Sequence, residues 1–132
     1  MSKTKIAPLT MGVEATADGY VIRLPIKTIS ENNAHEHWRV RHRRRKAQRE
    51  TAAGWIPGDC CHWPAWVIRI VRVAPGKLDD DNLSGSQKAV RDGIADGIGI
   101  DDGDGRITWQ YDQRRGAAKE YAVEITLTKG TT

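Results

Sequence analysis

The chain has 132 residues, the length of one domain, and its 39% hydrophobic and 29% charged residues are ordinary for a globular protein. No apolar run approaches the ~20 residues of a membrane span, so the composition argues against a membrane protein. The formal net charge of +4 suggests an anionic partner.

The N-terminal part of the chain predicts an extension, a strand and a basic helix. Residues 1–17 have no clear periodicity and are expected to form a flexible extension before a domain at 18–132. The stretch "GYVIRLPIKT" (19–28) is rich in β-formers and predicts a strand. Residues 30–55 begin with a capping serine and continue with helix formers, which predicts a helix entered through a turn at 30–33.

The rest of the chain completes an α+β pattern. Glycines and prolines at 54–64 indicate a loop, and "AWVIRIVRVA" (65–74) is the clearest strand. A helix is expected over 82–96, followed by two strands within 105–116 and 119–129 that a turn near 116–118 would join. The order βαβαββ predicts a single α+β domain with a mixed or largely antiparallel sheet covered by two helices.

The cysteines indicate a reducing compartment. Cys60 and Cys61 are adjacent, and neighbours rarely form a disulfide. Together with His62 they lack the second ligand pair of a zinc site. No signal-peptide pattern opens the sequence, so a cytoplasmic protein is expected.

Negative charge is concentrated in "KLDDDNLSGSQKAVRDGIADGIGIDD" (77–102), which contains seven aspartates. On one helix at 100° per residue, Asp81, Lys88 and Asp92 share a face. Carboxylates just before and just after that helix could converge on it, and clustered carboxylates repel unless a cation such as Mg²⁺ joins them. The alternative, that these aspartates only cap and solubilise a helix, stays open.

A calcium-binding loop is the obvious competitor, because "DDGDGRI" looks like the middle of an EF-hand. With Gly105 at loop position 6, positions 1 and 12 would be Ile100 and Tyr111, where the loop needs carboxylates. The register excludes this type of site.

The segments "DDDNL", "QKAVRDGI" and "GIDD" resemble, in order and context, the motif of the RusA family of Holliday junction resolvases. Earlier, "LPIKTISENN" is similar to the family's strand ending in proline followed by a polar turn, and the resemblance spans about residues 20–127. It implies a RusA-like fold and a homodimeric endodeoxyribonuclease that uses Mg²⁺, with Mn²⁺ as a possible substitute. Such enzymes cut four-way DNA junctions in recombination and repair, commonly in bacteria and their prophages.

The resemblance also implies roles for individual residues. The implied catalytic residues are Asp79, Asp81, Lys88 and Asp102. The implied metal ligands are Asp79, Asp81, Asp101 and Asp102. Lys88 follows Asp81 by seven residues where some members have four, and both spacings return to about the same helix face.

A basic run within residues 39–49 is the expected DNA-binding segment, because clustered cations neutralise backbone phosphates. Its cationic residues are Arg39, Arg41, Arg43, Arg44, Arg45, Lys46 and Arg49. Arg114 and Arg115, expected at a hairpin tip, are a second candidate, and the five tryptophans are interpreted as core or dimer contacts. Two alternatives remain open: a non-catalytic DNA- or RNA-binding module, and a nuclease for other branched DNA.

Overall fold

One mixed sheet organises the described part of the computed structural model, which comprises residues 11–30 and 37–131. Its strands are β1 (Gly12–Ala15), β2 (Gly19–Leu24), β3 (Ala65–Ala74), β4 (Ile107–Arg115) and β5 (Ala122–Gly130). Their spatial order is β1-β2-β5-β3-β4, and β3 and β4 are parallel while the other neighbours are antiparallel. The expected α+β class with a mixed sheet is confirmed.

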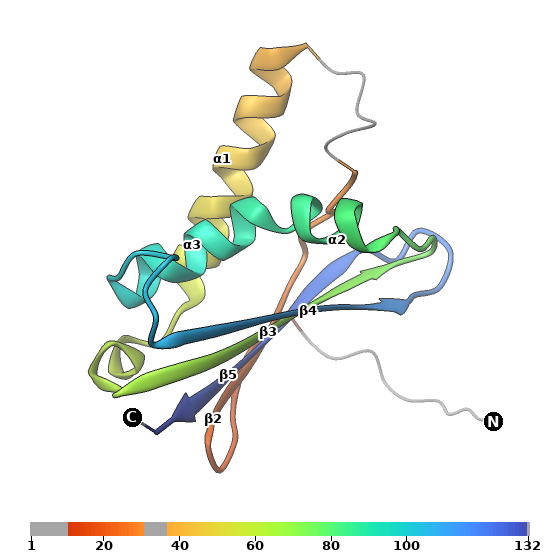
Figure 1. Ribbon diagram of the computed structural model, residues 1–132. Coiled ribbons are helices and arrows are strands. Elements are labelled where there is room, and N and C mark those ends of the chain that lie inside the picture. The colour runs from red at the N-terminus through yellow and green to blue at the C-terminus, as the bar shows by residue number, and fades with distance from the viewer. Residues whose placement is uncertain (1–10, 31–36, 132) are drawn as a thin grey trace, which may run out of the picture.

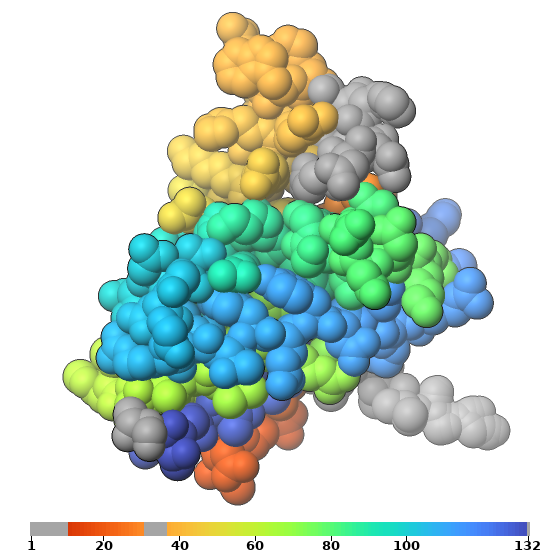
Figure 2. All heavy atoms as spheres, in the orientation of Figure 1, coloured from red at the N-terminus to blue at the C-terminus, as the bar shows by residue number. Residues whose placement is uncertain are grey.

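The helices lie on one face of this sheet (Figure 1). They are α1 (Trp38–Trp55), α2 (Asp80–Ser86) and α3 (Lys88–Ile98), and a short 3₁₀ helix, η1 (Gly58–His62), follows α1. Figure 2 shows that the first turns of α1 project beyond the layer formed by α2 and α3. None of the helices in the described ranges combines the length and apolar character needed to cross a lipid bilayer.

The core fills the space between the sheet and α3. Ile22, Ile125 and Ile70 are directly opposite one another on β2, β5 and β3, and all three are fully buried. Val90 and Ile94 of α3 are also fully buried and belong to the same cluster. Burial of each such side chain contributes about 1.5–3 kcal/mol, so this contact fixes α3 on the sheet.

The N-terminal elements differ from the sequence-based prediction in two places. The segment expected as an extension contains β1, which pairs with β2 from Gly12 to Ala15. This strand is an almost entirely exposed edge and so leaves no hydrophobic alternation to detect. The helix expected from residue 30 begins at Trp38, with His37 as its N-cap; residues 1–10 and 31–36 lie outside the described residues.

The two C-terminal strands do not form the expected hairpin. Strand β3 lies between β4 and β5, and the connection after β4 passes the end of β3, where the Gly116 amide donates to the Ala74 carbonyl at 2.8 Å. The apolar sequence of β3 suits a strand between two neighbours, whereas β4 is more polar and forms an edge. Arg114 and Arg115 therefore lie at the end of an edge strand and not at a hairpin tip.

Candidate functional site

The first group of predicted site residues lies at the start of α2. Asp79 is the N-cap, and its Oδ1 accepts a hydrogen bond of 2.9 Å from the Asn82 amide. Asp80 and Asp81 occupy the first turn, where the helix dipole favours negative charge, and all three aspartates are exposed. The capping role that the sequence left open is thus filled by Asp79.

Strand β4 holds the chain that leads into α2. The Leu78 amide donates to Gln113 Oε1 at 3.0 Å, and Gln113 Nε2 donates to the Leu78 carbonyl at 2.6 Å. The Gln113 side chain thus forms the two hydrogen bonds that the Leu78 backbone would form with a neighbouring strand in a sheet. The aspartates that follow are therefore anchored near the C-terminal end of β4.

The helix expected over 82–96 is interrupted at Gln87. This residue has φ −105° and ψ 3°, is fully buried, and separates α2 from α3. The premise that Asp81, Lys88 and Asp92 share a face of one helix is therefore wrong for Asp81. Lys88 and Asp92 both belong to α3, one turn apart, and their Nζ and Oδ1 atoms lie 2.7 Å from each other.

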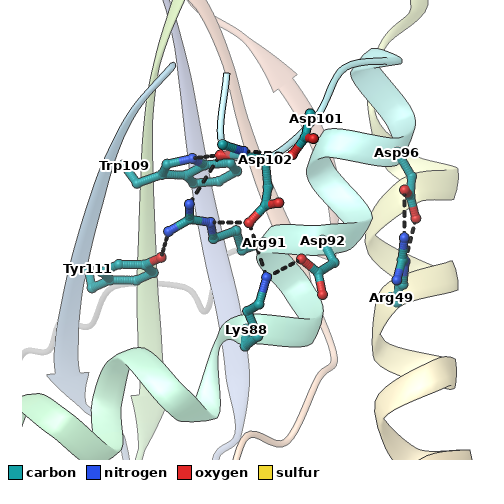
Figure 3. Close-up of polar contacts among 10 residues, drawn as sticks. Arg49, Lys88, Arg91, Asp92, Asp96, Asp101, Asp102, Trp109 and Tyr111 are labelled. Atoms are coloured by element: carbon teal, nitrogen blue, oxygen red, sulfur yellow. Dashed lines mark hydrogen bonds and ion pairs between the residues drawn. The ribbon is translucent and has the colours of Figure 1, made fainter. Parts of the chain in front are cut away.

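Asp102 lies at the centre of the second group, in the loop after α3 (Figure 3). Its Oδ2 is 3.0 Å from Lys88 Nζ and 2.9 Å from Arg91 Nε. The hydrogen bond from Lys88 is the largest influence that lowers the pKa of the Asp102 carboxyl below its usual value. In turn, hydrogen bonding to Asp92 and then Asp102 raises the pKa of the Lys88 ammonium, despite the opposing effect of burial.

Two aromatic residues of β4 hold Arg91 in this group. The Arg91 guanidinium lies over the Trp109 ring, 4.7 Å from its centroid, and Nη1 donates to the Tyr111 hydroxyl at 2.7 Å. The Trp109 indole and Arg91 Nη2 both donate to the Asp102 carbonyl, at 2.9 and 3.1 Å. Asp101 is exposed and its carboxylate accepts from the Gly103 amide at 2.9 Å, so it shapes the same loop.

Sequence reasoning missed Arg91, Trp109 and Tyr111. A signal was present, because Arg91 follows Lys88 by one helical turn and two aromatics separated by one residue share a strand face. Only the parallel placement of β4 beside β3 shows that these aromatics lie beneath α3.

The acidic group at the start of α2 and the acidic group in the loop after α3 are hydrogen-bonded to different residues of β4. Leu78, next to Asp79, is bonded to Gln113, whereas Asp102 is bonded to Trp109, four residues earlier, which corresponds to about 13 Å of strand. Within residues 11–30 and 37–131, no three His, Cys, Asp or Glu side chains are grouped closely enough to hold a metal ion. The carboxylates suit Mg²⁺ chemically, but Asp79 and Asp81 are not assembled with Asp101 and Asp102. The metal site stays a prediction.

Helix α1 carries its charges unevenly. Side chains three and four residues apart form one stripe that lines a groove between α1 and α3 of about 390 Å³. The stripe consists of Trp38, Arg41, His42, Arg45, Lys46 and Arg49, and Ala89 and Asp92 form the α3 side. Arg49 also joins the two helices through Asp96, with Nε–Oδ2 at 2.6 Å (Figure 3).

The other predicted DNA-binding residues lie elsewhere on α1. The Arg39 guanidinium lies 5.3 Å from the centroid of the Trp38 ring. Arg44 lines a second hollow against residues 25–29, and Arg43 is exposed. The seven cations predicted to bind DNA therefore do not form one continuous surface. Four of them line the groove.

Comparison with known proteins adds no family assignment. No protein-family model matches the chain, and a search of the curated proteins finds no match.

Proposed function

We propose that this protein is a Mg²⁺-dependent, structure-selective endodeoxyribonuclease that resolves four-way DNA junctions by phosphodiester hydrolysis. The observation that supports it is the placement of the basic helix α1 and the exposed aspartates of α2 on the same side of the sheet (Figures 1 and 2). One DNA substrate on that side can contact both. The motif resemblance of residues 77–102 gives the proposal its chemistry.

Each part of this side has a distinct task in the proposal. The α1 cations neutralise backbone phosphates and supply affinity that falls as salt rises. Asp79, Asp81, Asp101 and Asp102 offer the oxygen ligands that Mg²⁺ prefers, and a bound metal would activate water and stabilise the leaving oxygen. In the described arrangement these aspartates form two separate groups, Asp79 with Asp81 and Asp101 with Asp102. Ion pairs with Asp92 and Asp102 hold Lys88 in place, and a substrate phosphate would have to compete with these carboxylates for its ammonium group.

The proposal includes a homodimer in the cytoplasm. Two symmetric cuts in a four-way junction require two sites related by a twofold axis. The buried Cys60, present as a free thiol, suits a reducing compartment.

A cleavage assay on labelled four-way, forked and linear duplexes, with Mg²⁺, Mn²⁺ or EDTA, tests the activity. Asp81→Asn should abolish cleavage and leave junction binding intact, because Asp81 is exposed and only its charge changes. Asp80→Asn is the matched control, since it removes the neighbouring charge from the same helical turn. Equal cleavage by wild type and Asp81→Asn would exclude the proposed role of Asp81.

A specific observation favours a second candidate, a non-catalytic DNA- or RNA-binding module. Asp79 is engaged as a cap and Asp102 in ion pairs, so each has a structural task without any metal. Binding of the junction without cutting under Mg²⁺ or Mn²⁺ would support this module. Cutting confined to forks or flaps would instead identify a nuclease for other branched DNA.

A further inference from the structure

One face of α1 packs on α3 in the C-terminal half of the helix and lines the groove in the N-terminal half. Its C-terminal half packs on α3 at glycines: a Cβ on Gly93 would lie 2.2 Å from the Arg49 carbonyl oxygen, and one on Gly97 would lie 2.6 Å from Ile56 Cγ1. Toward the N-terminus the same stripe continues with Lys46, Arg45 and then Trp38, over the groove. The packing against α3 therefore fixes the direction in which these side chains point.

The groove is positively charged. Among the lining residues in the described ranges, Asp92 is the acidic one, and it is already paired with Lys88 at 2.7 Å. Arg49 is paired with Asp96, but neither Arg45 nor Lys46 has an ion-pair partner anywhere in the described ranges of the chain. An anionic ligand would therefore meet cations whose charge is not already balanced.

An aromatic ring stands at the outer end of the groove. Trp38 is the first residue of α1 and is 65% exposed, in contrast to Trp66, which is 1% exposed and belongs to the core. The Arg39 guanidinium lies 5.3 Å from the centroid of the Trp38 ring, and the centroid of the His37 ring lies 5.8 Å from it. Proteins that bind single-stranded nucleic acids combine these two features: bases stack on exposed aromatic rings, and cationic side chains contact the phosphates.

The size of the groove suits a single strand better than a duplex. A hollow of about 390 Å³ is on the scale of a small-molecule pocket. It cannot enclose a duplex, whose major groove alone is about 12 Å wide.

We propose that the groove between α1 and α3 binds an unpaired DNA strand, with phosphates on Arg45 and Lys46 and a base stacked on Trp38. This deepens the proposed function and rests on it, since it names the unpaired nucleotides of a branch point as the part of the substrate that the groove takes.

The test measures binding of a labelled oligothymidylate of about 20 nucleotides and of a matched duplex, by fluorescence anisotropy in EDTA. Trp38→Ala should weaken binding of the single strand by about 5- to 150-fold, the range that one stacked base supplies, and change duplex binding less than twofold. Trp38→Phe should retain most of the affinity. Trp55→Ala is the matched control, because Trp55 is a 44% exposed tryptophan of the same helix outside the groove.

Several results would overturn the inference. Unchanged single-strand binding by Trp38→Ala, or an equal loss on the duplex, would remove the stacking role. A shift from dimer to monomer in sedimentation with Trp38→Ala would identify the groove as a subunit contact. Because EDTA prevents metal-dependent cleavage, the test is separate from the nuclease proposal: the wild-type protein can fail to cut junctions while the groove binds a single strand, and it can cut junctions while Trp38→Ala leaves single-strand binding unchanged.

Discussion

Gly93→Ala tests how closely α1 and α3 approach. The new Cβ would lie 2.2 Å from the Arg49 carbonyl oxygen and 2.8 Å from Ala52 Cβ. The first distance is about 1 Å shorter than the ~3.3 Å at which carbon and carbonyl oxygen ordinarily meet. Since the obstructing atom belongs to the backbone, no side chain can turn away, and α1 must move.

The expected effect is a net loss of about 2 kcal/mol in the free energy of unfolding. Overpacking of this kind costs up to about 3 kcal/mol, and the better helix propensity of alanine returns about 1 kcal/mol. The matched control is Gly85→Ala in α2, where a Cβ would meet nothing within 4 Å. That variant should be stabilised, by at most about 1 kcal/mol.

Urea unfolding followed by circular dichroism measures both variants. The midpoint of Gly93→Ala should fall and that of Gly85→Ala should rise slightly, with similar slopes because the surface exposed on unfolding is the same. If both glycines accept alanine equally well, α1 does not lie against α3 as described. The contact between α1 and α3 would then not fix the position of the groove.

Two further predictions concern single titratable groups. Because the pKa of Asp102 is lowered in the folded protein, chiefly by Lys88, its stabilising effect is present above its unfolded pKa and is lost as the pH falls through the folded pKa. Melting temperatures between pH 7 and pH 2 should therefore fall less for Asp102→Asn than for wild type, and parallel curves would contradict the ion-pair network. Burial is the main reason that the pKa of the Cys60 thiol is raised to about 12, so in the native protein only the exposed Cys61 should react with Ellman's reagent at pH 8. Two rapid reactions would show that Cys60 is accessible.

The parts of the fold that sequence predicted correctly are those with strong local patterns. Strand β3 was predicted at its observed bounds, because its apolar run is buried along most of its length. The position of β3 between β4 and β5 depends on a contact between distant segments, and the interruption at Gln87 depends on burial of a polar side chain. Neither leaves a local pattern.

For the candidate site, the sequence predicted the identity of the site residues better than it predicted which of them lie close together. Lys88 and Asp102 were both singled out, and their charged atoms lie 3.0 Å apart. Asp79 and Asp81 were expected beside them, but that expectation used one continuous helix, and the chain has two.

One face of α1 carries both the contact with α3 and the positive charge of the groove. Substituting Arg45 or Lys46 would change the charge of the groove and leave the contact with α3 untouched. Inserting one residue between Arg49 and Ala52 would instead rotate the whole basic stripe by about 100° away from the groove, with every cation retained. In natural or engineered variants of this protein, the identity of the α1 side chains can drift, but the helical phase between its two halves cannot.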